Sequence, residues 1–459
     1  MIVRTHAGQV RGEATTTGAR FRGIPYAAAP EGELRFAAPA PAPSWDGVRD
    51  ARAAGPTAPQ RHREIPGLDL SAVVGDGWRP GPEYLTVDVW TPDPGAGSLP
   101  VLVFLHGGAF LGGTGSAPVY DGTAFTRAGA VLVTVQYRLG VEGFLPLGEA
   151  TNLGLRDHLA ALRWVGENIA AFGGDPGNVT LFGESAGAIS VACLLGSPLS
   201  QGLFRRVIVQ SGHANLVRGR AELDRLTTAV ATGLGVEPTA EAFRGLPTER
   251  LLEAQDALLR PGGTPDLRDA DGHDRSFGLS PFLPLVGDDV LPVHPGEAIR
   301  GGAGGDVDLI AGTCREEMRL YFGPAGLLDV LTEEQAVAML SASHPDAAGV
   351  LAGYGLGDGR TAGEVFVEAM TDLVFGDGVR ELVAAHRGRS FRYEFAWQAP
   401  KLGACHGMEL PFVFDSLAAS TSFTGEGAPA ELAREVNGAW ARFAATGDPG
   451  WCAEPAVLG

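Results

Sequence analysis

Residues 180–187 read Thr-Leu-Phe-Gly-Glu-Ser-Ala-Gly, a short apolar strand that runs directly into Gly-x-Ser-x-Gly. Glycines two positions either side of Ser185 allow a turn so sharp that the serine oxygen stands clear of the sheet edge. The N–H of Ala186 then lies at a helix N-terminus, where it can meet negative charge. Because 67 glycines make a chance match easy, the strand at 178–182 and the apolar helix at 186–195 supply the necessary context. Ser185 is therefore predicted to be a nucleophile for acyl transfer.

Strands and helices alternate around this turn. Continuous apolar, β-branched runs are typical of strands that are covered on both faces of a sheet. The predicted elements are strands at 100–105 and 130–135, a helix over 155–172, the strand and helix around Ser185, strands at 206–210 and 307–311, and a last helix over 430–445. This order favours an α/β fold with a mostly parallel central sheet and helices on both sides.

No linker, charge block, low-complexity tract or repeat divides the 459 residues. With 45% hydrophobic residues, the chain can bury a large core. Between about 214 and 305, and again between about 324 and 388, the pattern turns helical and irregular. We therefore expect one domain over 1–459, with two mainly helical insertions that form the walls of a substrate gorge.

The charge balance is strongly acidic, with a formal net charge of −19. An acidic chain is a poor partner for nucleic acid or an anionic membrane. No signal peptide is visible, and no run of about 18 apolar residues could span a bilayer. The sequence thus predicts a cytoplasmic, bacterial-type protein with neither nucleic acid nor membrane as a partner.

Four cysteines are widely scattered, at Cys193, Cys314, Cys405 and Cys452. Their spacing does not match a metal site, and in a chain of this size it is typical of free thiols in a reducing compartment. No metal is predicted.

An activated serine needs a base within hydrogen-bond reach, and in this architecture the base comes last in the chain. Five histidines lie well beyond Ser185, namely His273, His294, His344, His386 and His406. His406 follows a strand-like stretch and is itself followed by a glycine, which indicates a tight loop. The other four are interpreted as turn, surface or helix-end residues, so His406 is the predicted base.

The acid that orients the base should lie just past a strand, between the serine and the histidine. The strand predicted at 307–311 is followed by Gly-Thr-Cys-Arg-Glu-Glu over 312–317. Both Glu316 and Glu317 fit this position, and the spacing alone does not distinguish them as the acid.

A developing oxyanion needs N–H donors that are already in place. His106-Gly107-Gly108-Ala109 offers them at the end of the strand at 100–105, where glycines let the backbone approach a substrate. Gly107 and Gly108, together with Ala186, are the predicted donors. The alternative interpretation is a plain Gly-Gly turn.

Taken together, these motifs resemble the type-B carboxylesterase family of the α/β-hydrolase fold, which includes bacterial para-nitrobenzyl esterases and cholinesterases. The resemblance runs almost end to end. It is carried by Phe-Arg-Gly-Ile-Pro-Tyr-Ala at 21–27, Asn-Leu-Gly-Leu-Arg-Asp at 152–157, Asn-Ile-Ala-Ala-Phe-Gly-Gly-Asp-Pro at 168–176, Gly-Glu-Ser-Ala-Gly-Ala at 183–188 and the segment from His406 to Phe414.

The resemblance implies a role for each matched residue. It assigns Ser185 as nucleophile, His406 as base and Glu317, rather than its neighbour, as acid. It implies the oxyanion donors Gly107, Gly108 and Ala186. It places Ser211, in Gln-Ser-Gly at 210–212, and Glu184 beside these groups in supporting positions. It also implies that no metal or cofactor takes part.

Two departures from the family pattern stand out. Ala58 and Tyr84 occupy positions where relatives commonly carry a disulfide, so the loop at 61–82 is expected to be less tethered and is a candidate lid. Met318 follows the acid where glycine is usual, so the loop after Glu317 is expected to have a different shape.

The resulting hypothesis is a serine carboxylesterase that hydrolyses short- to medium-chain or aryl esters through an acyl-enzyme. The alternatives are a triad hydrolase that prefers amides, thioesters or lipids, and a non-catalytic interaction protein on the same fold. Phe110 is interpreted either as a pocket residue or as core. The partner is a small-molecule ester, and the chain is expected to be a monomer or a small homo-oligomer.

Overall fold

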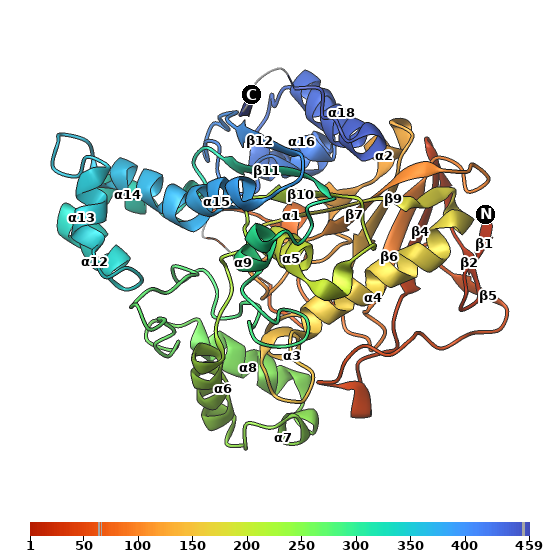
Figure 1. The fold of residues 1–459 in the computed structure, drawn as a ribbon, viewed down its shortest axis with the longest axis horizontal. Coiled ribbons are helices and arrows are strands. Elements are labelled where there is room, and N and C mark those ends of the chain that lie inside the picture. The colour runs from red at the N-terminus through yellow and green to blue at the C-terminus, as the bar shows by residue number, and fades with distance from the viewer. Residues whose placement is uncertain (63–64, 66, 452–454) are drawn as a thin grey trace.

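A computed structural model describes residues 1–62, 65, 67–451 and 455–459. Three residues of the candidate lid, and Cys452, lie outside the described residues. The fold that follows is shown in Figure 1.

A ten-stranded sheet forms the centre of the described chain. In spatial order its strands are β13 (Ala456–Leu458), β12 (Ser390–Phe395), β11 (Asp308–Cys314), β10 (Arg206–Gln210), β9 (Gly174–Glu184), β7 (Leu99–Leu105), β8 (Val131–Val135), β6 (Thr86–Thr91), β4 (Gly18–Pro25) and β3 (Glu13–Thr15). The strands from β13 to β8 pair in parallel, whereas β6, β4 and β3 pair antiparallel at the N-terminal edge. The predicted mostly parallel sheet is confirmed, with an antiparallel edge added to it. A separate small sheet joins β1 (Ile2–Arg4), β2 (Gln9–Arg11) and β5 (Val48–Asp50).

Strand β7 shows why the central strands are continuously apolar. Val101, Val103 and Leu105 face one core, while Leu102 and Phe104 face the other, and all five are fully buried. Helices α4 (Leu153–Asn168) and α5 (Ala186–Gly196) contribute to the first core, and α18 (Ala430–Thr446) contributes to the second. Since both faces are covered, each strand residue is removed from water whichever way it points.

The two segments expected to be insertions contain helices and loops, together with an isolated β-bridge between Arg218 and Leu285. Within 214–305 these are α6 (Arg220–Leu234), α7 (Ala240–Arg244), α8 (Thr248–Leu258) and α9 (Pro295–Gly301). Within 324–388 they are α11 (Leu327–Val330), α12 (Glu333–Ser341), α13 (Ala347–Gly353), α14 (Ala362–Thr371), a π-helical turn at Asp372–Gly376 and α15 (Asp377–Ala385). Figure 1 shows α6 to α8 below the sheet and α12 to α14 projecting to one side.

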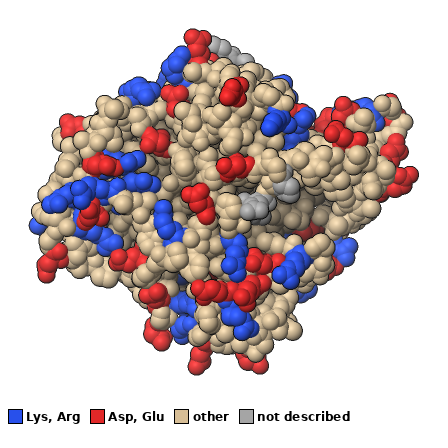
Figure 2. Space-filling model, turned by 180° about the vertical axis from the view of Figure 1, so that it is seen from behind, with Lys and Arg blue, Asp and Glu red and all other residues tan. Residues whose placement is uncertain are grey.

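The surface charges, the thiols and the character of the helices concern the predicted compartment and partners of the chain. Acidic and basic side chains are interspersed over the face in Figure 2. Cys193, Cys314 and Cys405 are buried free thiols. No described helix has both the length and the apolar character needed to cross a bilayer. The described residues also contain no cluster of histidine, cysteine and acidic side chains suited to a metal ion.

Candidate active site

Ser185 lies at the junction of β9 and α5 with φ 53° and ψ −121°. A non-glycine residue at positive φ is strained by about 1–3 kcal/mol and persists only where its surroundings hold it. Here the Ser185 N–H donates to the Gln210 carbonyl at 2.9 Å, and the Ser185 carbonyl accepts from Ile189 at 2.9 Å. Gly187 is required two residues on, because an added Cβ would lie 1.9 Å from the Leu105 carbonyl oxygen. The sequence thus forces the backbone into the sharp turn that presents the serine.

Glu317 and His406 form a buried ion pair. His406 Nδ1 lies 2.6 Å from Glu317 Oε2, and the two side chains are 5% and 0% exposed. The other carboxylate oxygen of Glu317 accepts from Ser211 Oγ at 2.6 Å and from the Cys314 N–H at 2.7 Å. With both oxygens occupied, the carboxylate is fixed in place and accepts the Nδ1 proton of the imidazole. Glu316 instead pairs with Arg319 at 3.1 Å.

The far nitrogen of His406, Nε2, is buried and makes no hydrogen bond to any described residue. The imidazole is held between two rings, since Phe375 stacks on it at 4.7 Å between centroids and Tyr321 lies at 5.8 Å. Glu184 Oε1 lies 3.2 Å from Nε2. Nε2 thus lies in a site formed by a carboxylate and two aromatic faces.

Three successive positive φ angles define the loop after β7, at Gly108, Ala109 and Phe110. Gly107 packs directly against the serine, because a Cβ there would lie 2.4 Å from Glu184 Oε2 and 3.0 Å from Ser185 Cβ. Ser280 Oγ donates to the Ala109 carbonyl at 2.6 Å and helps to hold the loop. Gly107 therefore borders the serine closely, and Gly108 follows it in the same loop. Ala186 occupies the first turn of α5, where N–H groups have no acceptor within the helix.

A small, largely apolar cavity adjoins Ser185, with a volume of about 30 Å³. Its walls include Phe110, Leu216, Phe375 and Tyr321. Phe110 is both a wall residue and fully buried, with its ring 4.4 Å from that of Phe144. The two interpretations of this residue are therefore compatible.

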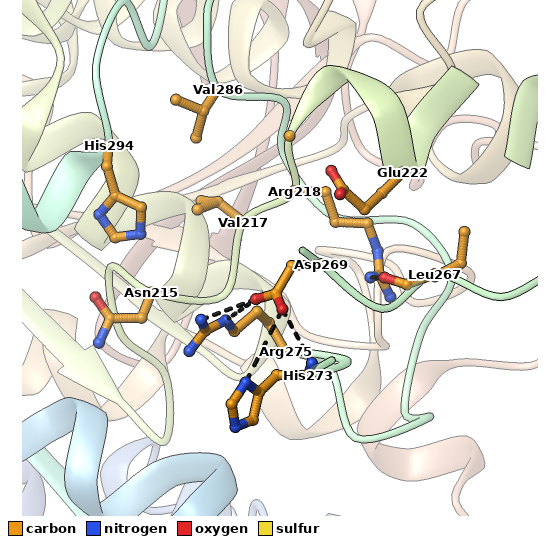
Figure 3. A pocket seen from close by; sticks show the side chains of 11 residues that line it. Asn215, Val217, Arg218, Glu222, Leu267, Asp269, His273, Arg275, Val286 and His294 are labelled. Carbon is orange, nitrogen blue, oxygen red and sulfur yellow. Dashed lines mark hydrogen bonds and ion pairs between the residues drawn. The ribbon is translucent and has the colours of Figure 1, made fainter. Parts of the chain in front are cut away.

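A larger cavity of about 440 Å³ lies elsewhere, between Asn215, Asp269, His273 and His294 (Figure 3). It contains none of Ser185, Glu317 and His406. The size of a cavity is therefore a poor guide to the chemistry in this chain. We take the smaller cavity as the one relevant to Ser185, because it borders the strained serine.

Each of the four histidines that were alternatives to His406 as the base contacts other side chains or the backbone. His294 caps the N-terminus of α9, where it accepts from the Gly296 N–H. His386 lies at the end of α15, with Nδ1 2.8 Å from Ser390 Oγ and Nε2 3.0 Å from the Gly304 carbonyl oxygen. His273 lies 3.9 Å from Asp269 and stacks edge-on with His344 at 4.8 Å.

Three further residues lie near the site, and none of them has a role predicted from the sequence. Glu409 is fully buried, where it accepts from Gln210 Nε2 at 3.2 Å and Cys314 Sγ at 2.8 Å. Burial and the nearby Glu317 charge raise the pKa of Glu409. Phe375 and His213 are the others. Two hints exist in the sequence: His213 lies two residues after Ser211, and Glu409 lies in the segment from His406 to Phe414 that resembles the family.

The fold and this arrangement define the class: the protein is an α/β-hydrolase, with a strained serine at the strand–helix turn and a carboxylate–histidine pair beyond it. The family model described as "Carboxylesterase family" matches residues 1–455. The chain therefore belongs to the carboxylesterase family, and it is a carboxylic ester hydrolase.

Comparison with individual proteins supports the same family assignment. The chain is 38% identical to the para-nitrobenzyl esterase of Bacillus subtilis (strain 168), over 98% of this chain and 90% of that protein. It is 35% identical to the phenmedipham hydrolase of Pseudarthrobacter oxydans, with the same coverage. Among solved structures, a carboxylesterase of Geobacillus stearothermophilus is similar with a TM-score of 0.84 and 36% identity, over 100% of this chain and 93% of that one.

Proposed function

We propose that the protein hydrolyses short- to medium-chain or aryl carboxylic esters through an acyl-enzyme on Ser185. His406 Nε2 takes the Ser185 proton as the oxygen attacks the ester carbonyl carbon. Glu317 stabilises the imidazolium, while N–H groups of Gly107, Gly108 and Ala186 hold the tetrahedral oxyanion. Collapse of this intermediate expels the alcohol, which takes the proton from His406. Water then attacks the acyl-enzyme by the same steps and releases the acid.

The observation that carries the proposal is the 2.6 Å contact between His406 Nδ1 and a Glu317 carboxylate whose other oxygen is occupied. It fixes the Nδ1–H tautomer and leaves Nε2 basic. Amide, thioester and lipid substrates require the same machinery. The small apolar cavity beside Ser185 favours compact esters over long-chain lipids, since about 30 Å³ admits only a few heavy atoms.

The test is hydrolysis of para-nitrophenyl esters from acetate to palmitate. We expect the highest kcat/KM for the short esters, with a fall of at least about tenfold by palmitate because a long chain exceeds the cavity. A preference for palmitate, strengthened at a lipid–water interface, would contradict the proposal in favour of a lipase. Parallel assays with the corresponding anilides and thioesters show whether amides or thioesters are hydrolysed faster than esters.

The pH dependence should reveal the charges around His406. Burial favours its neutral form, but the charges of Glu184 and Glu317 outweigh burial and raise the pKa of His406 to about 9. His406 must be neutral to accept the serine proton, so kcat/KM should still be rising with pH above 7.

Burial raises the pKa of Glu184 itself to about 8, so its negative charge acts on His406 mainly toward the alkaline end of the range. A Glu184→Gln variant removes that charge and should move the rising limb to lower pH by about one unit. The measurement is kcat/KM for para-nitrophenyl acetate between pH 5 and 10, corrected for spontaneous hydrolysis. Glu431→Gln, at an exposed position in the first turn of α18, is the control, because it makes the same chemical change far from His406. If the rising limb of kcat/KM stays at the same pH in Glu184→Gln, Glu184 does not raise the pKa of His406.

We also propose that the protein works in the cytoplasm, as a monomer or a small homo-oligomer. Support for the compartment comes from Cys193, Cys314 and Cys405, which are free thiols in the described chain.

A further inference from the structure

A π-helical turn at Asp372–Gly376 joins α14 to α15 within the second insertion. Such turns are rare and occur frequently at functional sites. This turn presents two residues to the cavity beside Ser185, Val374 and Phe375. The ring of Phe375 also stacks on His406, with an angle of 26° between the planes. One turn of chain thus shapes both the cavity and the surroundings of the base.

His213, three residues after the end of β10, contacts this turn. Its Nε2 lies 2.8 Å from the Val374 carbonyl oxygen, and its Nδ1 accepts from the Asn215 N–H at 3.2 Å. Because Nδ1 is an acceptor, the ring proton is on Nε2 and is donated to Val374. Burial lowers the pKa of His213 to about 4, so the ring stays neutral at ordinary pH.

The imidazole of His213 is packed tightly against α15. A Cβ added to Gly378, in the first turn of this helix, would lie 2.2 Å from the ring. His213 is itself only 5% exposed. Asn215 adds a second link to the same helix, since its Nδ2 donates to Glu381 Oε2 at 2.7 Å. The segment from His213 to Asn215 therefore contacts both the π-helical turn and α15, the helix after it.

Residues 215–217, which continue this segment, form a wall between two cavities. Leu216 lines the cavity beside Ser185, whereas its neighbours Asn215 and Val217 line the larger outer cavity of Figure 3. The position of this wall, and of the turn attached to it, determines how much space remains beside the serine.

We propose that His213 is a positioning residue of the active site, which holds the Val374 carbonyl so that Phe375 stays against His406 and limits the size of the ester group accepted beside Ser185. His213 touches neither His406 nor Ser185 in this role, and it acts through Phe375. The inference rests on the proposed function, because it assigns the cavity beside Ser185 to one arm of the ester.

Because the cavity is small, the position of Phe375 decides which substrate groups fit in it. About 30 Å³ holds roughly two water molecules. A shift of the ring by about 1 Å would therefore change which groups fit, and misplacement of this order can cost about 100-fold in rate.

The test compares two amide variants, His213→Gln and His213→Asn. The glutamine Nε2 can reach the Val374 carbonyl much as the histidine Nε2 does, whereas asparagine is one methylene shorter and cannot. We expect His213→Gln to stay within about threefold of the wild type. In His213→Asn we expect kcat/KM for the acetyl ester to fall about tenfold, and the ratio of butyryl to acetyl activity to rise at least about threefold.

Both arms of the ester are varied, with para-nitrophenyl acetate to hexanoate as an acyl series and ethyl to hexyl acetate as an alcohol series. His386→Asn is the control, because it removes a similar histidine-to-carbonyl contact at the far end of α15. If His213→Asn fails to fold, His213→Met is used, since it also lacks the donor but buries no polar atom.

Phe375→Ala tests whether His213 acts through that ring. If it does, adding His213→Asn to Phe375→Ala should change selectivity no further. Unchanged selectivity in both series for His213→Asn, an equal loss in His213→Gln, or effects that simply multiply would overturn the inference. Loss of hydrolysis in the wild type, or hydrolysis that survives Ser185→Ala, would instead overturn the proposed function and leave the two failures distinguishable.

Discussion

Replacing Glu317 by glutamine is expected to lower kcat for para-nitrophenyl acetate by about 10⁴-fold, with little change in KM. The carboxylate accepts the Nδ1 proton of His406 at 2.6 Å and is held by Ser211 and the Cys314 N–H. Glutamine fits the same space, but it is uncharged and its NH₂ group can donate to Nδ1. The imidazole would then carry its proton on Nε2, the atom that must accept from Ser185.

The neighbouring glutamate is the matched control for this prediction. Glu316 pairs with Arg319 and accepts from the Ala404 N–H at 3.1 Å, away from His406. Glu316→Gln should therefore keep kcat within about threefold, as an ordinary surface substitution does. The measurement is kcat of the two variants by steady-state kinetics. Their melting temperatures show whether both are folded. A larger loss in Glu316→Gln than in Glu317→Gln would reverse the assignment of the acid.

The central strands were predictable because each is a continuous apolar run, and β7 and β9 also lead into turns that contain glycines. β10 occupies the predicted range, and β7, β8 and β11 agree to within three residues at each end. β9 is longer than its apolar part, since it begins at Gly174 and pairs there with Leu99 before the register shifts. The antiparallel edge of β6, β4 and β3 was not predicted, because a strand's pattern records its burial but not the direction of its partner.

The two adjacent glutamates show where pattern reasoning stops. Glu316 and Glu317 follow the same strand, and a difference of one residue decides which side chain turns inward. Local spacing could not separate them, whereas the family resemblance selected Glu317. In the folded chain Glu317 is fully buried beside His406, while Glu316 stays partly exposed with Arg319.

The sequence does not reveal the roles of His213 and Phe375 for a different reason. The hydrogen bond from His213 reaches a carbonyl 161 residues away, and no local period encodes such a contact. The π-helical turn adds a residue to the helical repeat, so Phe375 does not fall on the face that a regular helix would predict. Contacts of this kind appear only when the chain is folded.

Replacing Ser185 by alanine is expected to lower kcat by about 10⁶-fold, the largest effect predicted for any single side chain here. The substitution removes the oxygen that forms the acyl-enzyme, while the backbone donors around it stay in place. The remaining activity should come from these donors and from binding alone, so it should show neither a burst of para-nitrophenol nor labelling by a fluorophosphonate probe.

Ser190→Ala is the matched control on the same helix. Ser190 is fully buried in α5, and its Oγ donates to the Ala186 carbonyl at 3.0 Å, so the change is chemically identical but lies one turn beyond the nucleophile. We expect kcat within about threefold of the wild type and full labelling by the probe. Burst kinetics that persist in Ser185→Ala would place the nucleophile elsewhere. Equal losses in both variants would mean that disturbance of α5, rather than removal of a nucleophile, accounts for the effect.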